Sequence, residues 1–331
     1  MAEGNRVVTV GVDTHKDAHV AAALDASGAL LGTASFPADA RGYASMVAWM
    51  RAFGRVEAAG VRVLEVSAPD RSERRRRGKS DGIDAEQAAR AALAGTRCAP
   101  AKSRCAEMGA LGALEAAYAG AVKARTAALN ALQAQVVALP EEARAPLRGK
   151  GSSELVRACA SMRPGAGSSP ETLAKVALRS LARRARMLDE EAKGLEAEID
   201  ALTKALAPST RSLLGAGPHV AARLLLAAGA NVSRLRSEAS FSMLCGASPV
   251  PVSSGRADRH RLSRAGDRRA NSALYTMAIT RMAHDERTRS YVARRMSEGK
   301  TKKDAIRCLK RYIAREAYRA LAQDMEALGM S

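Results

Sequence analysis

The sequence predicts an α/β N-terminal region followed by a mainly helical remainder, and three observations favour this fold class. Short apolar segments alternate with turn-forming residues over positions 6–36, which is typical of strands. Long segments rich in Ala and Leu cover positions 106–139 and 173–206, which is typical of helices. Aromatic residues make up only 3% of the chain, so we expect a core of packed helices built largely from Ala and Leu.

The first 66 residues are predicted to hold three strands, a helix and a fourth strand, at positions 6–12, 19–24, 30–36, 41–53 and 61–66. A three-stranded meander followed by a helix and another strand is how a ribonuclease-H-like domain begins. A generic α/β sheet begins in the same way. Asp13 lies where the first strand ends, so its carboxylate could reach a metal at the edge of the sheet.

A basic run at positions 71–79 precedes a predicted helix that begins at Asp81 and continues through Ala94. The i, i+3 spacing places Asp81 and Asp84 on one face of this helix, where they could hold a divalent cation together with Asp13. Alternatively, Ser80 or Asp81 caps the helix and Asp84 interacts favourably with its positive end. The sequence leaves both interpretations open.

The middle of the chain is predicted to hold two long helices and a linker. The helical pattern that starts at Ala106 stops before Pro140, and a segment rich in Gly, Ser and Pro at 149–170 is typical of a linker or a partly disordered loop. The second helix carries leucines at sevenfold spacing, namely Leu181, Leu188, Leu195 and Leu202. This spacing favours a coiled-coil arm or a dimerising hairpin, and an ordinary packed helix is the alternative. We therefore predict domains at 1–148, 149–207 and 208–331.

The C-terminal part combines a glycine turn with a serine loop. Gly215 and Gly217 precede a helix, as in a helix-hairpin-helix element that offers backbone amides to a phosphate, although a tight turn has the same pattern. Ser253, Ser254 and Gly255 stand before a dense arginine run. A hydroxyl beside several guanidinium groups suits attack on a phosphodiester. The alternative is a basic surface loop whose serines merely interact with solvent or cap the next helix.

Composition favours a nucleic-acid partner. The 331 residues carry a formal net charge of +19, so nucleic acid is the first expectation and an anionic membrane surface the second. The scarcity of aromatic residues argues against single-strand binding by stacked aromatics. No apolar run is long enough to span a membrane and no signal peptide is evident, so we expect a cytoplasmic protein. The five cysteines form no C-x-x-C pair and are expected to be reduced.

Four segments carry a family resemblance: VTVGVDTHKDAHVAA, APDRSERRRRGKSDGIDAEQAARAAL, LLGAGPHVAARLL and FSMLCGASPVPVSSGRADRHRLSRAGDRRANSALYTMAI. Together they resemble the transposases of insertion-sequence family one-ten, also called DEDD transposases or bridge-RNA recombinases. The resemblance covers nearly the whole chain. It implies a RuvC-like, ribonuclease-H-like N-terminal domain with an acidic DEDD set for Mg²⁺, and a C-terminal transposase domain whose serine becomes joined to DNA.

The resemblance also assigns roles to residues of this chain. Asp13 corresponds to the first acid, Asp81 and Asp84 to the third and fourth, and Ser254 to the nucleophile, with Ser253 as the fallback. The expected activity is RNA-guided DNA transposition or recombination. The expected partners are donor and target DNA, a structured guide (bridge) RNA and further copies of the chain in a dimer or tetramer, in the bacterial cytoplasm near the nucleoid.

Nucleic acid is expected to contact the basic run, the serine loop and the glycine turn. The residues concerned are Arg74, Arg75, Arg76, Arg77, Lys79, Arg256, Arg259, Arg261, Arg264, Arg268, Arg269, Gly215 and Gly217. Arginine suits this role because its guanidinium group binds two phosphate oxygens at once. Electrostatic contacts with phosphates do not depend on the base sequence. These residues would therefore position nucleic acid without recognising a particular sequence.

One departure from the family pattern concerns the second acid. Relatives carry a further strand ending in Glu before the strand at 61–66, and a segment about the length of a short strand plus a helix is absent here. If the strand at 61–66 pairs with the first strand instead, Glu65 takes the place of the lost acid; Glu57, in the connection, is less well placed. When the flanking residues are aligned, however, the strand at 61–66 corresponds to the family strand that follows the missing one. Glu65 is then an ordinary residue of that strand. The alternative function is therefore a catalytically impaired relative that binds nucleic acid.

Overall fold

The structure of the chain, a computed structural model, describes residues 7–53, 63–66, 80–96, 98–102, 105–254, 257–262 and 266–329. It divides the chain into two compact units, 1–102 and 103–331. The predicted boundaries at 148 and 207 differ from this division, because the first long helix packs against the second one and both lie in the second unit. Within the described residues, no helix combines the length and the apolar character needed to cross a bilayer.

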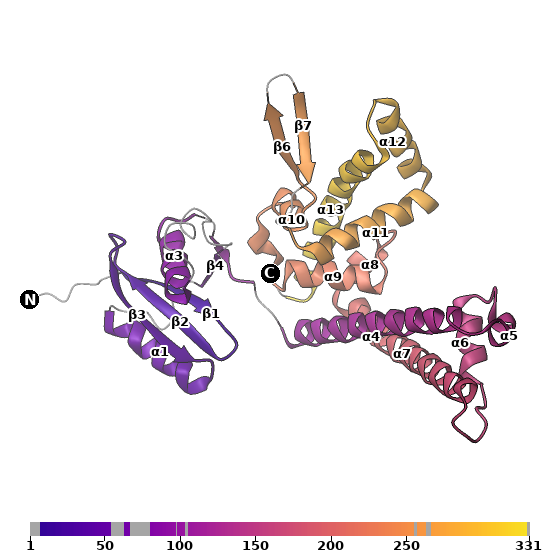
Figure 1. Cartoon of the computed structure of the whole chain (residues 1–331). Helices are drawn as coiled ribbons and strands as arrows, with labels where there is room; N and C mark the ends of the chain where they lie inside the picture. The colour runs from indigo at the N-terminus through magenta and orange to yellow at the C-terminus, as the bar shows by residue number, and fades with distance from the viewer. Residues whose placement is uncertain are drawn as a thin grey trace, which may run out of the picture. The chain divides into compact units, whose positions relative to one another are not determined.

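The N-terminal unit contains a three-stranded antiparallel sheet in the order β1-β2-β3, followed by α1 (Figure 1). The bounds are β1 Thr9–Thr14, β2 Ala18–Leu24, β3 Leu30–Pro37 and α1 Ala40–Phe53. Phe36, Trp49 and Phe53 form an aromatic cluster between β3 and α1. The predicted α/β character of this region and the helical character of the remainder are confirmed. The ribonuclease-H-like topology stays a prediction.

Helix α3 (Asp81–Leu93) packs directly against β1 at Gly11. A Cβ atom on Gly11 would lie 2.1 Å from the carbonyl oxygen of Ala85 and 2.4 Å from the amide nitrogen of Ala89, which is too close for any side chain. Both alanines are fully buried. Small residues on the strand and on the helix therefore let the two backbones touch, as glycine allows where backbones approach closely.

The fourth strand does not pair with the first in the described residues. Strand β4 (Leu64–Val66) pairs with β5 (Cys98–Pro100) in a two-stranded antiparallel sheet of its own, with Glu65 opposite Ala99. The alternative in which the strand at 61–66 pairs with β1 is therefore wrong for the residues described. The hydrogen bonds of β4 to a neighbouring strand go to β5.

In the C-terminal unit, α4 (Ala106–Val137) and α7 (Pro170–Leu206) lie side by side as a long helical pair, which we call the arm (Figure 1). A line of buried residues follows α7 at sevenfold spacing: Leu178, Ala185, Ala192, Ile199 and Leu206. The four predicted heptad leucines lie three residues further along in each repeat, and Leu188 is the buried one among them. The heptad pattern therefore serves a helix pair within one chain.

The predicted linker contains a folded helix. Helix α6 (Ser152–Ala160) follows α5 (Glu141–Arg144) and the short turn η1 (Ala145–Leu147) at one end of the arm (Figure 1). Its Leu155 and Cys159 are buried in a small core with residues of α4 and α7. The prediction of a linker or partly disordered loop at 149–170 is therefore wrong for residues 152–160. Apolar side chains one turn apart give this helix a face that can be buried.

The rest of the C-terminal unit is helical apart from one hairpin. Its elements are α8 Pro208–Ser212, α9 Pro218–Ala228, η2 Val232–Leu235, α10 Glu238–Leu244, β6 Pro249–Ser254, β7 Ala257–Leu262, α11 Arg268–His284, α12 Glu286–Ser297 and α13 Lys302–Ala327. Phe241, Leu274 and Ile313 lie in its main core. The buried carboxylate of Asp324 accepts hydrogen bonds from the amides of Ser209 and Thr210, at 2.7 and 2.9 Å, and so ties α13 to α8.

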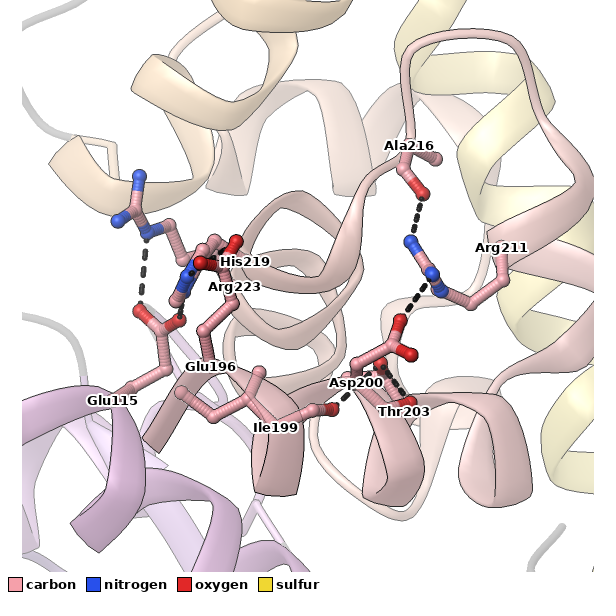
Figure 2. Close-up of polar contacts among 9 residues, drawn as sticks. All are labelled: Glu115, Glu196, Ile199, Asp200, Thr203, Arg211, Ala216, His219 and Arg223. Atoms are coloured by element: carbon pink, nitrogen blue, oxygen red, sulfur yellow. Dashed lines mark hydrogen bonds and ion pairs between the residues drawn. The ribbon is translucent and has the colours of Figure 1, made fainter. Parts of the chain in front are cut away.

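Buried polar contacts fix the arm to α9. Glu115 of α4 accepts a hydrogen bond from Nδ1 of His219 at 2.5 Å and another from Nε of Arg223 at 3.2 Å, as Figure 2 shows. Burial raises the pKa of Glu115, but the hydrogen bond from His219 and the charge of Arg223 outweigh it and hold the pKa below its ordinary value. Arg211 joins the second arm helix through Asp200, at 2.5 Å (Figure 2).

Gly11→Ala should destabilise the N-terminal unit by about 1–3 kcal/mol, because the added methyl group overfills the contact with α3. The single tryptophan, Trp49, lies in this unit, so its fluorescence during urea unfolding measures the change. Gly82→Ala on α3 is the matched control: a Cβ there meets nothing within 4 Å, so this variant should keep wild-type stability or gain slightly. Equal behaviour of the two variants would contradict the close contact.

Glu115→Gln should lower the free energy of unfolding of the C-terminal unit by about 1.5–3 kcal/mol at pH 7, because it removes hydrogen bonds to a charged group. The pKa of Glu115 is lowered on folding, so its contribution is complete above the ordinary value of 4.5 and disappears as the pH falls below it. The difference between variant and wild type, measured by far-UV circular dichroism in urea, should therefore shrink at acid pH. Glu190→Gln is the control, because Glu190 forms an exposed ion pair with Arg186. This variant should change the free energy of unfolding by less than about 0.5 kcal/mol.

Candidate functional site

Two acids and a histidine come together at the end of β1. Nε2 of His15 lies 3.2 Å from an Asp13 carboxylate oxygen and 3.4 Å from one of Asp81. One possible ligand atom from each of the three residues lies within 4.8 Å of the other two. Asp13 is half-buried, and His15 and Asp81 are exposed. The group, which we call the acidic cluster, is thus open to an incoming ligand.

The contact at Gly11 explains why Asp13 meets Asp81. Side chains alternate along a strand, so Asp13 stands on the same face as Gly11, the face that α3 covers. Asp81 lies one helical turn before Ala85 on α3 and therefore on the same side of that helix. Ser80 is the N-cap, accepting a hydrogen bond from the amide of Ile83 at 3.4 Å. The capping role falls to Ser80, and Asp81 faces Asp13.

Two expected ligands lie outside the acidic cluster. Asp84 is in the first turn of α3 but is not among the three grouped residues. Glu65 lies in β4, in the separate two-stranded sheet. Glu57 and the basic run Arg74, Arg75, Arg76, Arg77 and Lys79 fall outside the described residues. The structure thus brings together the first and third expected acids.

His15 is the member that sequence reasoning missed. The sequence pattern around it predicts only a turn after the first strand. The signal available in the sequence was its position two residues after the first acid, where an extended chain returns to the same face. Imidazole nitrogens bind metals and also donate to carboxylates, so a histidine at this spacing belonged in the candidate set.

The serine loop is a β-hairpin. Strands β6 and β7 pair antiparallel, with Ser253 opposite Asp258 and Ser254 opposite Ala257, and Figure 1 shows the hairpin projecting from the helices around α10 and α11. Arg259 and Arg261 lie in β7. Three expected site residues lie outside the described part of the chain, namely Gly255, Arg256 and Arg264.

The serines do not cap the helix that follows. The N-cap of α11 is Asp267, whose carboxylate accepts from the amides of Arg269 and Ala270 at 2.8 and 2.9 Å. The alternative that Ser253 or Ser254 caps this helix is therefore wrong. Arg268 and Arg269 are exposed in the first turn of α11, near the end of the hairpin in sequence.

Buried contacts hold the base of the hairpin. The amide of Asp267 donates to the carbonyl of Leu244 at 2.7 Å, which joins the segment entering the hairpin to the segment leaving it. The side-chain amide of Asn271 donates to the carbonyls of Cys245 and Gly246 at 2.7 and 3.1 Å. A Cβ on Gly266 would lie 2.3 Å from the Gly246 amide nitrogen, so the two segments are in backbone contact. The hairpin therefore starts from a fixed position.

Lys310 of α13 adds a further contact at the base of the hairpin. We call Lys310, Asn271 and the backbone carbonyls of Cys245 and Gly246 the clamp. The ammonium group of Lys310 donates to the side-chain oxygen of Asn271 at 2.7 Å, and the residue is buried. Burial lowers the pKa of Lys310, and the nearby positive charge of Arg307 lowers it further. The hydrogen bond orients the Asn271 amide, so that its NH₂ group faces the two carbonyls at the hairpin base.

The glycine turn connects α8 to α9. Gly215 has φ +86°, and a Cβ there would lie 3.0 Å from Cα of Met277, so the turn packs on the backbone of α11. Arg281 donates to the carbonyl of Leu214 at 2.9 Å. Gly217 is the N-cap of α9, and the space around its Cα is open. Packing accounts for Gly215, and the binding of phosphate by the turn stays a prediction.

Part of this unit resembles known proteins. Residues 209–293 match the Transposase IS116/IS110/IS902 family, and this stretch includes the glycine turn, the serine hairpin and α11. The chain is also 32% identical over 130 residues to the "Insertion element IS110 uncharacterized 43.6 kDa protein" of Streptomyces coelicolor. That alignment covers 38% of this chain and 32% of the relative, so the chain spans about a third of the relative's length. Both matches support the assignment that the sequence resemblance predicted, an IS110-family transposase.

Proposed function

We propose that the chain is a DNA transposase that cuts and rejoins DNA through Ser254, with the acidic cluster holding Mg²⁺. The observation that carries the proposal is the convergence of Asp13 and Asp81 within one small group at the end of β1. The family match covers the serine hairpin, which supports the part of the proposal that concerns Ser254. Ser254 is the last residue of β6, at the end of the strand opposite to the clamped base of the hairpin.

The chemistry assigned to Ser254 is transesterification. Its hydroxyl oxygen attacks the phosphorus of a phosphodiester, a serine–phosphorus ester bond forms, and the bond to one deoxyribose oxygen breaks. The hydroxyl proton passes to a base, and the leaving oxygen takes up a proton. The reverse reaction, with a new deoxyribose hydroxyl, rejoins the DNA. Bond energy is kept throughout, so the reaction needs no nucleotide hydrolysis.

The donor set of the acidic cluster fits a divalent cation. Asp13 and Asp81 offer the carboxylate oxygens that Mg²⁺ prefers. His15 lies between the two carboxylates and hydrogen-bonds Asp13, so it holds them at short range. Asp84 is proposed as a further acid of the set from the resemblance. A cation held there would stabilise the negative charge that develops on the phosphoryl oxygens.

The partners are proposed on the resemblance and on charge. We infer that donor and target DNA and a structured guide RNA bind a dimer or tetramer of the chain, in keeping with the net charge of +19. Arg259 and Arg261 in β7, with Arg268 and Arg269 in α11, are the described basic residues nearest in sequence to the proposed nucleophile. They would offset the charge of the phosphate that Ser254 attacks.

One observation favours a second function. In the described residues β4 pairs with β5, so no strand beside β1 supplies the second acid of a four-acid set. A chain with an incomplete set would bind nucleic acid without cutting it. The catalytically impaired relative therefore remains the alternative function, and the experiments below separate it from the enzyme.

Ser254→Ala should abolish the covalent protein–DNA adduct, because the attacking oxygen is removed. The full chain is incubated with the DNA and RNA of its own element and Mg²⁺, and the adduct is detected on denaturing gels. DNA retention should be unchanged. Ser253→Ala is the control and should keep the adduct. An adduct that survives in Ser254→Ala but not in Ser253→Ala would move the role to Ser253, and the absence of any adduct in the wild type would favour the impaired relative.

Asp81→Asn should raise the Mg²⁺ concentration needed for half-maximal adduct formation by at least about tenfold, since one carboxylate ligand is lost. Asp17→Asn removes an exposed acid from the turn that also holds His15, and should leave this concentration unchanged. The measurement is a Mg²⁺ titration of adduct yield for both variants and the wild type. The same midpoint in Asp81→Asn as in the wild type would rule out the acidic cluster as the metal site.

A further inference from the structure

Basic side chains form a stripe along α13. The basic residues Lys303, Arg307, Arg311, Arg315 and Arg319 follow one another at intervals of four residues. Each lies about 6 Å along the helix from the next and about 40° around it, so the row winds about halfway around α13. Four of them are exposed and Arg315 is half-buried. We call this row the α13 stripe.

The α13 stripe is only partly neutralised. Arg307 pairs with Asp304 at 2.7 Å, and Glu238 of α10 reaches Arg319 at 2.6 Å. In the described part of the chain no ion pair is recorded for Lys303 or Arg311. Like charges four residues apart on a helix repel, at roughly 0.2–0.5 kcal/mol per pair. Positions 286–319 carry twelve Lys or Arg against four Asp or Glu, so a polyanion would relieve this repulsion.

Two tyrosines lie beside the stripe. Tyr291 of α12 and Tyr312 of α13 meet edge to face, with ring centroids 5.7 Å apart. The guanidinium group of Arg294 lies 5.6 Å from the ring centroid of Tyr291, and that of Arg315 lies 5.7 Å from that of Tyr312. Half of the Tyr312 side chain is exposed. The scarcity of aromatic residues predicted no stacking surface, but the fold brings two of the six tyrosines together among arginines.

This combination selects one kind of ligand. Guanidinium groups neutralise phosphates, and aromatic and guanidinium faces stack on bases. The bases of a duplex are already stacked and paired, so only an unpaired base can use the tyrosine. A lipid surface would meet the positive charge but has no planar group to stack. The surface therefore fits a polyanion that carries exposed rings.

We propose that α12 and α13 form a binding surface for a nucleic acid strand with an unpaired base, in which the α13 stripe contacts the phosphates and Tyr312 stacks on the base. The inference rests on the proposed function in that it needs a nucleic-acid partner. It is independent of the serine chemistry.

The test compares unpaired and paired strands on the full-length protein. Fluorescence anisotropy measures the affinity for a labelled single-stranded oligonucleotide and for a hairpin duplex of the same composition, each as DNA and as RNA. Tyr312→Ala should weaken binding of the unpaired strand about 5- to 150-fold, the equivalent of 1–3 kcal/mol per stacked base. Binding of the duplex should stay within about twofold. The DNA and RNA arms show which strand the surface prefers.

Three further variants separate stacking from charge and from misfolding. Tyr312→Phe keeps the ring and should keep the affinity. Tyr275→Ala removes an equally exposed tyrosine from α11 and should change neither affinity. Arg311→Ala should weaken the unpaired strand and reduce the slope of log affinity against log salt by about one unit. Circular dichroism of each variant confirms the helical fold.

Several results would overturn the proposal. Unchanged binding of the unpaired strand in Tyr312→Ala would remove the stacking contact, and equal losses for strand and duplex would reduce the surface to a charged patch. Loss of binding to phosphatidylserine vesicles in Arg311→Ala, with nucleic-acid binding intact, would assign the face to a membrane. The adduct assay with Ser254→Ala is scored separately, so failure of the nucleophile and failure of this surface are distinguishable.

Discussion

The backbone contact between α3 and Gly11 of β1 determines where the acidic side chains of the N-terminal unit lie. Because no Cβ intervenes, the helix lies directly on the strand, with Ala85 and Ala89 as its contact residues. Side chains two residues apart on a strand share a face, as do side chains four residues apart on a helix. Asp13 and Asp81 therefore lie close to each other beside this contact. A larger residue at position 11 would move the whole helix, so one glycine controls both packing and the proposed chemistry.

In the C-terminal unit, buried polar groups fix the positions of the serine hairpin and of the arm. Lys310 and Asn271 hold the two carbonyls at the base of the serine hairpin, and Glu115 and His219 hold the arm against α9. Each group is costly to bury alone and stable only with its partner, so each contact permits one arrangement and disfavours others. The proposed recombinase would have to keep a nucleophile, a metal and long nucleic acids in register, and specific buried pairs of this kind would suit that demand.

Local patterns in the sequence predicted the three N-terminal strands, both long helices and the family. They also placed Asp13 at a strand end and Asp81 at a helix start. What they missed depends on contacts between distant segments: the pairing of β4 with β5, the burial of Leu155 at the end of the arm, and the meeting of Tyr291 with Tyr312. His15 was missed for a different reason, because a turn residue next to an acid was interpreted only as a turn.

Anomalous scattering from crystals of the full chain grown with Mn²⁺ tests most directly whether the contact at Gly11 builds a metal site. The expected result is a peak at about 2.0–2.6 Å from carboxylate oxygens of both Asp13 and Asp81, the range of metal–oxygen distances in proteins. Gly11→Ala crystals should lose the peak, because α3 is displaced. A wild-type structure that holds Mn²⁺ elsewhere, or keeps His15 between two unligated carboxylates at saturating Mn²⁺, would contradict a catalytic metal at this position.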